Sequence, residues 1–189
     1  MDAVGLDMTG WDGYVSRLSK AVPGFRNTFL HMEPKLDITN VPDELAGTLD
    51  FLISSDVFEH VPPPVGLAFA NARKLLKPGG VFILTVPFGR GDETAEHFPD
   101  LHDWELLTDG SAPRLLNRTR DGREQEFSDL HFHGGDGLTI EMRVFTQASA
   151  IRELEAAGFC DIRVRDEANL EHGIVWGPGG SVPITARAK

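Results

Sequence analysis

Residues 50–61 read DFLISSDVFEHV, and residues 76–87 read LKPGGVFILTVP. The runs at 48–55 and 81–86 are short, apolar and bounded by turn-forming residues, which is typical of buried strands. Between them, apolar side chains recur every three or four positions, which predicts an amphipathic helix that stops at the turn Lys77-Pro78-Gly79-Gly80. Strand, helix and strand within about 40 residues form a βαβ unit, whose strands should be parallel and whose crossover should be right-handed.

The flanking segments repeat this alternation less regularly. On the amino-terminal side we expect a strand at 3–6, a helix at 12–22 and a further strand at 27–32. On the carboxyl-terminal side we expect a helix at 147–157, a strand at 160–165 and strand pieces at 174–176 and 182–184. An alternation of strands and helices predicts an α/β fold, namely a doubly wound and mostly parallel sheet.

Residues 89–145 depart from the alternation. The segment is polar, contains turn pairs such as Asp121-Gly122 and includes the alternating run 114–118. Turn pairs between alternating runs are typical of antiparallel hairpins. We therefore predict a single domain over residues 1–189 with a hairpin and loop insertion at about 89–145.

Composition narrows the class of protein. The chain has 189 residues, a formal charge of −11 and the single cysteine Cys160, so an internal disulfide framework is excluded. No stretch approaches the roughly 20 continuous apolar residues of a membrane span, and an excess of negative charge disfavours binding to phosphate backbones. We expect a cytoplasmic protein whose partner is a small molecule or another protein, and neither a nucleic acid nor a membrane.

The two blocks that define the βαβ unit resemble the class I S-adenosylmethionine-dependent methyltransferases of the type 11-like group. In this chain and in that family, a strand ends in Asp-Val-x-Glu-His-Val, and Leu-Lys-Pro-Gly-Gly precedes the next strand. Residues 147–164 are similar to the last helix and sixth strand of that family. The resemblance implies a Rossmann-like methyltransferase sheet, S-adenosylmethionine as the cofactor, and a small molecule or glycan as the methyl acceptor.

The family's glycine-rich turn is the part of the pattern that this sequence lacks. In one register, Val4–Asp7 matches the second strand, and the first βα unit with its glycines is missing. In the other, Val4–Gly13 is itself the glycine-rich loop and Glu33 is the ribose-binding acid. We adopt the first register, because Trp11 would crowd the close backbone approach that glycines allow.

In the adopted register, the resemblance assigns cofactor contacts at the carboxyl ends of three strands. The acid of the second strand would accept hydrogen bonds from the ribose, an acid and apolar pair after the third strand would hold the adenine, and residues after the fourth strand would face cofactor and acceptor. These candidates are Asp7, Met8, Asp37, Ile38, Ser55 and Asp56. Simpler interpretations remain open, since Asp7 could cap the following helix and Asp37 could be a turn residue.

Asp56 and His60 are the candidate catalytic residues. A carboxylate and an imidazole at the mouth of the sheet crevice could remove the proton of an acceptor hydroxyl. The alternative is that Glu59 and His60 only cap and orient the loop. Methyl transfer needs an in-line approach and a desolvated site more than a strong base.

Two further hypotheses follow from the same sequence. The insertion carries side chains that could ligate a divalent metal, namely His97, His102, Asp103, His131 and His133, although we assign no metal ligands. A sheet without its first strand would also have a gap. Either the neighbouring strands pair directly, or a second copy donates a strand in a homodimer, or the gene begins upstream. A domain with such a gap could instead be a scaffold or oligomerisation module that binds no cofactor.

Overall fold

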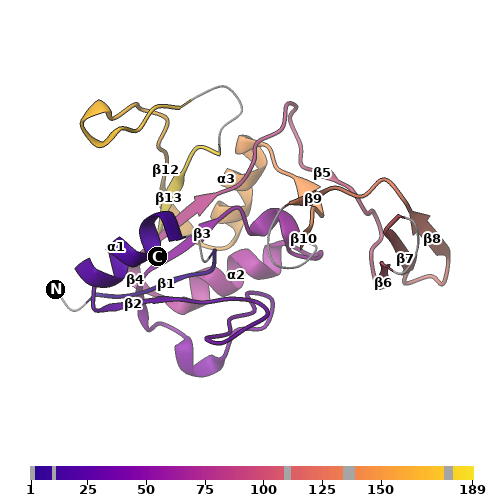
Figure 1. The fold of residues 1–189 in the computed structure, drawn as a ribbon, viewed down its shortest axis with the longest axis horizontal. Coiled ribbons are helices and arrows are strands. Elements are labelled where there is room, and N and C mark those ends of the chain that lie inside the picture. The colour runs from indigo at the N-terminus through magenta and orange to yellow at the C-terminus, as the bar shows by residue number, and fades with distance from the viewer. Residues whose placement is uncertain (1–2, 10–11, 109–111, 134–138, 177–180) are drawn as a thin grey trace.

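The computed structural model is a mixed sheet with helices on both faces and a projecting antiparallel arm (Figure 1). It describes residues 3–9, 12–108, 112–133, 139–176 and 181–189. The main sheet has six strands in the order β12-β13-β4-β3-β1-β2, with β13 antiparallel to its neighbours and the other pairs parallel. The prediction of an α/β fold with a mostly parallel sheet is confirmed. None of the described helices is long and apolar enough to cross a membrane.

The central βαβ unit consists of β3 (Leu49–Ser55), α2 (Gly66–Leu75) and β4 (Leu76–Thr85). The apolar face of α2 is buried through Ala68, Phe69, Ala72 and Leu75. The helix ends where Leu76 becomes extended. The segment 77–80 is not the separate turn that we predicted, because β4 runs through it with a register shift between Leu49 and Phe51. Gly79 has a φ of 80°, which a glycine adopts without steric strain.

The outer elements lie close to the predicted positions, with two differences. The outer elements are β1 (Val4–Asp7), α1 (Asp12–Ala21), β2 (Gly24–Asn27), α3 (Gln147–Ala156), β12 (Phe159–Val164) and β13 (Ile184–Ala188). The second strand begins three residues early, because Phe25 is the side chain that is buried there. At the other end, 174–176 forms only an isolated bridge between Asn169 and Ile174, and the strand proper is β13. The intervening turn 177–180 lies outside the described residues.

The two faces of the main sheet are covered unequally. On one face, Leu52, Phe82 and Leu84 are almost completely buried in a core that they share with α2 and α3. On the other face, Phe51 and Ile83 are only partly buried. The helix α1 contacts β2 at the edge of that second face. The carboxyl ends of the strands therefore lie beside a sheet surface that is only partly covered.

Strands β1 and β3 pair directly, so the gap that we considered is closed within the chain. β1 lies between β2 and β3, which is the place of the first strand in a doubly wound sheet, so the strand order does not support the register in which the first βα unit is missing. Gly5 and Phe51 lie opposite each other in this pair. A Cβ atom on Gly5 would lie 2.1 Å from the Phe51 ring, which extends across β1 and stacks on Phe25 with 6.1 Å between the ring centroids. The glycine thus provides the space through which an aromatic contact links three strands.

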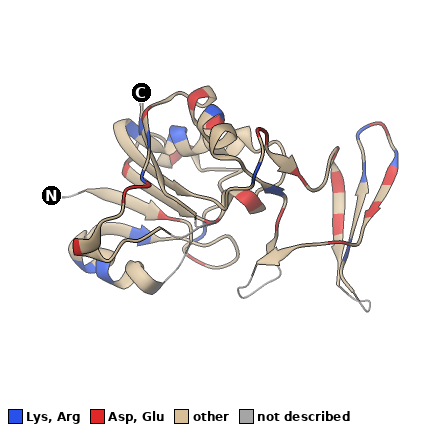
Figure 2. Cartoon of the chain, turned by 90° about the horizontal axis from the view of Figure 1, so that it is seen from above, with Lys and Arg blue, Asp and Glu red and all other residues tan. Residues whose placement is uncertain are grey.

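The segment 95–144 contains short antiparallel strands, and its middle part projects from the domain as an arm (Figures 1 and 2). They are β5 (Ala95–Glu96), β6 (Asp103–Leu107), β7 (Arg114–Arg118), β8 (Glu124–Phe127), β9 (Phe132–His133), β10 (Thr139–Ile140) and β11 (Arg143–Val144). The sheet β6-β7-β8 extends away from the main sheet, and Figure 2 shows that several of its residues are acidic. A second core around Phe98, Leu115 and Met142 supports the arm. The strands β5 and β11 pair with each other at the base of this segment, and the Met142 amide joins it to the domain by donating to the Glu59 carbonyl at 2.8 Å.

The contact between Gly5 and Phe51 is testable by a double-mutant cycle. Gly5→Ala should destabilise the protein by about 1–3 kcal/mol, because the new methyl group overlaps the ring. Phe51→Ala in the same chain should remove most of that additional cost. The measurement is the midpoint of urea unfolding. As a matched control, Gly13→Ala at an exposed position of helix α1 should stabilise the protein by about 0.5–1 kcal/mol. Additive effects of Gly5→Ala and Phe51→Ala on the free energy of unfolding would contradict the contact.

Candidate active site

The carboxyl ends of β1, β3 and β4 are joined by a small hydrogen-bond network. The hydroxyl of Thr9 donates to the Ser55 carbonyl at 2.9 Å and accepts from the Ser55 amide at 2.8 Å. The Met8 amide donates to the Ile53 carbonyl at 3.1 Å, and the Thr85 hydroxyl donates to Ser55 Oγ at 2.8 Å. The structure thus brings the predicted residues Met8 and Ser55 together at one edge of the sheet.

Asp7, at the end of β1, is completely buried. Its carboxylate accepts hydrogen bonds from the Tyr14 hydroxyl at 3.0 Å and from the Thr9 amide at 3.1 Å. Burial and the neighbouring Asp7 charge raise the pKa of Tyr14 above its ordinary value. Asp7 therefore orders the turn into α1, and a ligand would have to displace the Tyr14 hydroxyl to reach that carboxylate oxygen. Residues 10–11 of the alternative glycine-rich loop lie outside the described residues.

Asn27 lies opposite Asp7 on the adjacent strand β2. Its side-chain oxygen is buried and has no hydrogen-bond partner among the described residues. A buried amide oxygen without a donor is costly, so it marks a place where a donor group of a ligand would be favourable. Sequence reasoning did not single out Asn27, and the only available signal was its position near the end of a strand.

Asp37 and Ile38 have local structural roles. One carboxylate oxygen of Asp37 accepts from the amide and the hydroxyl of Thr39, at 2.8 and 2.7 Å, which closes a turn. The side chain of Ile38 is 5% exposed within the main core, and its carbonyl accepts from Asn71 on α2 at 2.8 Å. Among the described residues, no hydrogen bond joins this pair to Asp7 or Asp56. The Ile38 side chain therefore packs in the core, and its part in binding adenine stays a prediction.

Asp56 follows β3 directly and is exposed. Its φ of 53° is in the left-handed region, which aspartate tolerates better than most residues. Its amide donates to the Thr85 carbonyl at 3.0 Å, and Thr85 Oγ1 lies 3.4 Å from its carboxylate. Asp56 thus presents a carboxylate to solvent at the end of the two central strands.

Glu59 is the most unusual group near this edge. It lies in the 3₁₀ turn η2 (Phe58–His60), which follows Asp56, and is 1% exposed. Neither carboxylate oxygen has a hydrogen-bond partner among the described residues. Burial, together with the charges of Asp56 and Glu141, raises the pKa of Glu59 to about 8. A carboxylate in this position is destabilising unless a cation or a proton accompanies it.

Arg143, on β11, fastens the end of the insertion to η2. Its side chain is completely buried, and Nη1 donates to the carbonyls of Phe58, at 3.0 Å, and Val61, at 2.5 Å. Nε donates to Glu96 on β5 at 2.8 Å. The guanidinium therefore gives the Val61 carbonyl a donor and gives the Phe58 carbonyl a second donor besides the Val61 amide.

The same docking brings His133 and Glu141 close to Glu59 and His60. His60 Nδ1 lies 2.8 Å from the Ile140 carbonyl, and its ring centroid is 4.8 Å from that of His133. Glu141 pairs with His133 Nε2 at 2.9 Å and with His97 Nε2 at 2.7 Å. Burial lowers the pKa of His60, which favours the neutral imidazole.

The cluster differs from the histidine set that the sequence suggested. His133 and His97 both contact Glu141, and the rings of His97 and His131 are 5.5 Å apart. His102 and Asp103 are exposed at the start of the arm, and no described contact joins them to the other histidines. The group that converges instead includes Glu59 and His60, from the motif that ends β3. The adjacent Glu-His pair was the signal in the sequence, whereas nothing there indicated Glu141.

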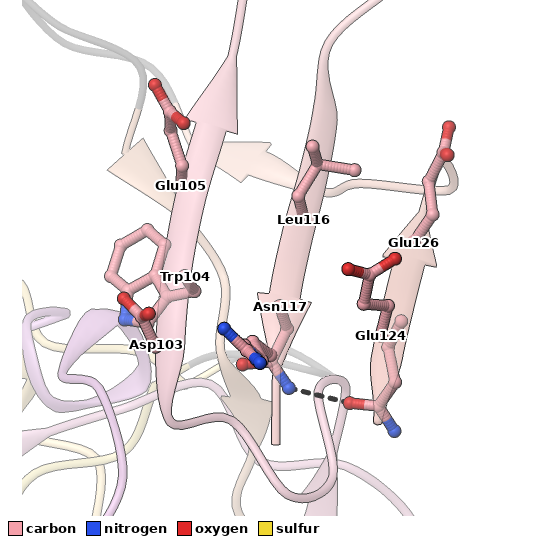
Figure 3. Close-up of a pocket in the computed structure, with 9 residues that line it drawn as sticks. Asp103, Trp104, Glu105, Leu116, Asn117, Glu124 and Glu126 are labelled. Carbon is pink, nitrogen blue, oxygen red and sulfur yellow. Dashed lines mark hydrogen bonds between the residues drawn. The ribbon is translucent and has the colours of Figure 1, made fainter. Parts of the chain in front are cut away.

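A hollow of about 420 Å³ lies on the arm, apart from the sheet edge (Figures 1 and 3). Figure 3 shows that acidic side chains surround it, namely Asp103, Glu105, Glu124 and Glu126. The Asn117 amide donates to Gln125 at 2.6 Å on the same strands. None of the residues predicted for a cofactor or for catalysis lines this hollow.

The sheet edge offers mainly hydrogen-bond acceptors. The carboxylates of Asp7 and Asp56 and the unpaired oxygen of Asn27 can each receive a donor. Glu59 adds a further acidic group close to Asp56. Such a set of acceptors suits a ligand that carries hydroxyl or amino groups together with a positive charge.

Comparison with known proteins gives a family and a fold. Residues 1–163 match the model of a family described as a methyltransferase domain. Among curated proteins, none matches the sequence.

Solved structures that resemble the fold include three methyltransferases. An S-adenosylmethionine-dependent methyltransferase from Mesorhizobium loti is 14% identical with a TM-score of 0.56, over 98% of this chain and 91% of the other. An amino pentose methyltransferase from Micromonospora echinaspora is 16% identical with a TM-score of 0.56, over 100% and 84%. A sugar N-methyltransferase from a Streptoalloteichus species is 13% identical with a TM-score of 0.58, over 100% and 81%. At these identities, the likeness concerns the fold.

The role of Arg143 in assembling the site is testable by substitution. Arg143→Met should lower the free energy of unfolding by on the order of 3 kcal/mol, because the buried carbonyls of Phe58 and Val61 lose their donor. Arg114→Met is the matched control, since the exposed ion pair of Arg114 with Glu126 should contribute less than about 1 kcal/mol. Chemical unfolding of both variants provides the measurement, and equal stability of the two would contradict this role.

Proposed function

Since this chain belongs to the class I S-adenosylmethionine-dependent methyltransferase family, we propose that it binds S-adenosylmethionine at the carboxyl edge of the main sheet and methylates a small molecule or glycan. The observation that carries the proposal is the set of acceptor groups at this edge, above all the buried unpaired oxygen of Asn27 beside Asp7. In open α/β sheets, ligands bind outside the carboxyl ends of the strands.

The ribose and adenine ends of the cofactor need hydrogen-bond acceptors, and this chain has them. Asp7 would accept from the ribose hydroxyls once the Tyr14 hydroxyl moves aside, and Asn27 would accept a further donor next to it. Asp37 is half-buried and follows the segment that we predicted as a strand at 27–32. It would accept a hydrogen bond from the adenine amino group. Met8 would give apolar contact, and Ile38 would act from within the core by supporting this loop.

At the reacting end, the cofactor supplies an electrophilic methyl group on a positively charged sulfur. Ser55 and Asp56 lie at the ends of the central strands, where the negative charge of Asp56 would favour that positive charge. The exposed carboxylate of Asp56 would also orient an acceptor group and take its proton. His60 lies deeper, with its Nδ1 engaged by the Ile140 carbonyl, so its Nε2 is the atom that can act.

The class of acceptor is proposed from two observations. Two of the similar solved structures are described as an amino pentose methyltransferase and a sugar N-methyltransferase. The segment that follows β4 also brings the carboxylate of Glu141 close to Glu59, just after the carboxyl end of β3, beside the proposed acceptor position. Hydroxyl-rich or amino-bearing acceptors fit acidic surroundings, because carboxylates accept their hydrogen bonds.

Calorimetric titration with S-adenosylhomocysteine tests the proposal directly. The wild-type protein should bind it with a dissociation constant in the micromolar range. Asp7→Asn should weaken binding about tenfold or more, because a charge-assisted hydrogen bond contributes about 1.5–3 kcal/mol.

The control is Asp43→Asn, which removes an exposed carboxylate that pairs only with Lys74 among the described residues. This variant should bind like wild type, and thermal melting should verify that both variants fold. Absence of binding by wild type up to millimolar ligand would overturn the proposed function and favour a scaffold role. Unchanged affinity of a folded Asp7→Asn variant would remove Asp7 from the site.

A further inference from the structure

The buried carboxylate of Glu59 is directed towards two imidazoles. Ligand atoms of Glu59, His60 and His133 all lie within 4.8 Å of one another. Glu59 is 1% exposed, and both its oxygens lack a hydrogen-bond partner among the described residues. Arg143, the nearby cation, pairs with Glu96 instead. The position therefore has a buried acidic group whose charge Arg143 offsets only in part and whose neighbours can donate lone pairs.

Each imidazole donates a hydrogen bond from one ring nitrogen to a neighbouring acceptor. This bond determines which ring nitrogen keeps a lone pair that could bind a metal ion. A carbonyl oxygen can only accept, so His60 Nδ1 carries the proton that it donates to the Ile140 carbonyl. The lone pair then lies on His60 Nε2, which is 3.8 Å from Glu59 Oε1. Likewise, His133 donates from Nε2 to Glu141, at 2.9 Å, which leaves Nδ1 free. Backbone carbonyls and carboxylates behind the rings are the usual support of metal-binding histidines.

We propose that Glu59, His60 and His133 form a binding site for a divalent transition metal ion, with Glu141 orienting His133 from behind. Metal–ligand bonds of about 2.0–2.2 Å place two tetrahedral ligand atoms about 3.4 Å apart. The observed 3.8 Å between His60 Nε2 and Glu59 Oε1 needs only a small contraction. Two imidazoles and one carboxylate favour zinc-like ions over magnesium or calcium, which prefer oxygen ligands.

Three protein ligands leave a coordination position open, as in catalytic metal sites. The His133 side chain is 39% exposed, so this side of the site faces solvent. Asp56 precedes Glu59 by three residues and interacts with it electrostatically. If the proposed methyltransferase function holds, the open position would take a hydroxyl or amino group of the acceptor and act on it as a Lewis acid.

Titration of tag-free, chelator-treated protein with ZnCl₂ tests the site without any methyl transfer. Wild type should bind one Zn²⁺ per chain with micromolar or tighter affinity, and its melting temperature should rise. MgCl₂ at the same concentration should have little effect. Glu59→Gln and His133→Ala should each weaken Zn²⁺ binding about tenfold or more, and Glu141→Gln should have a smaller effect of the same sign.

The stability of Glu59→Gln distinguishes a metal ligand from a structural residue. Without metal, this variant should be at least as stable as wild type, because a neutral amide of the same shape replaces a buried carboxyl group that has no hydrogen-bond partner among the described residues. With saturating Zn²⁺, the order should reverse, since only wild type gains the binding energy. His172→Ala, which removes an exposed histidine far along the chain, is the control and should bind Zn²⁺ like wild type.

Two results would overturn the site. One is the absence of Zn²⁺ binding by wild type up to millimolar concentration. The other is undiminished binding by folded Glu59→Gln and His133→Ala, which would assign the ion to other histidines. Neither result depends on S-adenosylhomocysteine binding, so failure of the metal site and failure of the proposed function can be told apart.

Discussion

The buried guanidinium of Arg143 is the interaction on which the site depends. It donates to the carbonyls of Phe58 and Val61 and thereby fixes the turn that follows β3 to the last strand of the insertion. Hydrogen bonds to buried carbonyls are expensive to lose, so the two segments are held in one arrangement. As a result, groups from the insertion reach the carboxyl edge of the sheet, and the projecting arm is attached beside the catalytic candidates and not at a remote surface.

The paired strands β1 and β3 show how the sheet remains continuous. Parallel pairing of β1 with β3 satisfies the backbone groups that a gap would have exposed. Gly5 permits this because the Phe51 ring occupies the space of its missing side chain and reaches Phe25. The cost is a sheet face that is only partly covered, with Phe51 and Ile83 half-buried. The carboxyl edge is nevertheless intact, and Thr9 joins its strands.

Electrostatics at this edge favour positively charged partners. Asp7, Asp56 and Glu59 lie at or just beyond the ends of two neighbouring strands, and Glu59 is buried without a compensating hydrogen bond. An arrangement of this kind lowers stability, and proteins retain it mainly where a ligand repays the cost. The proposed cofactor, with its charged sulfur, would be attracted by the negative charge at this edge, and the proposed metal ion would favour the ionised form of Glu59 over the protonated form that burial favours. The two proposals are therefore physically compatible and can be tested separately.

Local patterns in the sequence determined the fold class, the βαβ unit at its centre and the adjacent Glu59-His60 pair, because hydrophobic periodicity and turn residues act over short distances. They did not determine which polar groups would meet. His60 contacts Ile140, 80 positions away, and Glu141 joins His97 to His133 only because the insertion folds back onto η2. Sequence patterns likewise could not show that Ile38 packs in the core or that Asp7 is covered by Tyr14. Tertiary structure decided these points, since burial and long-range contacts depend on how separate elements pack together.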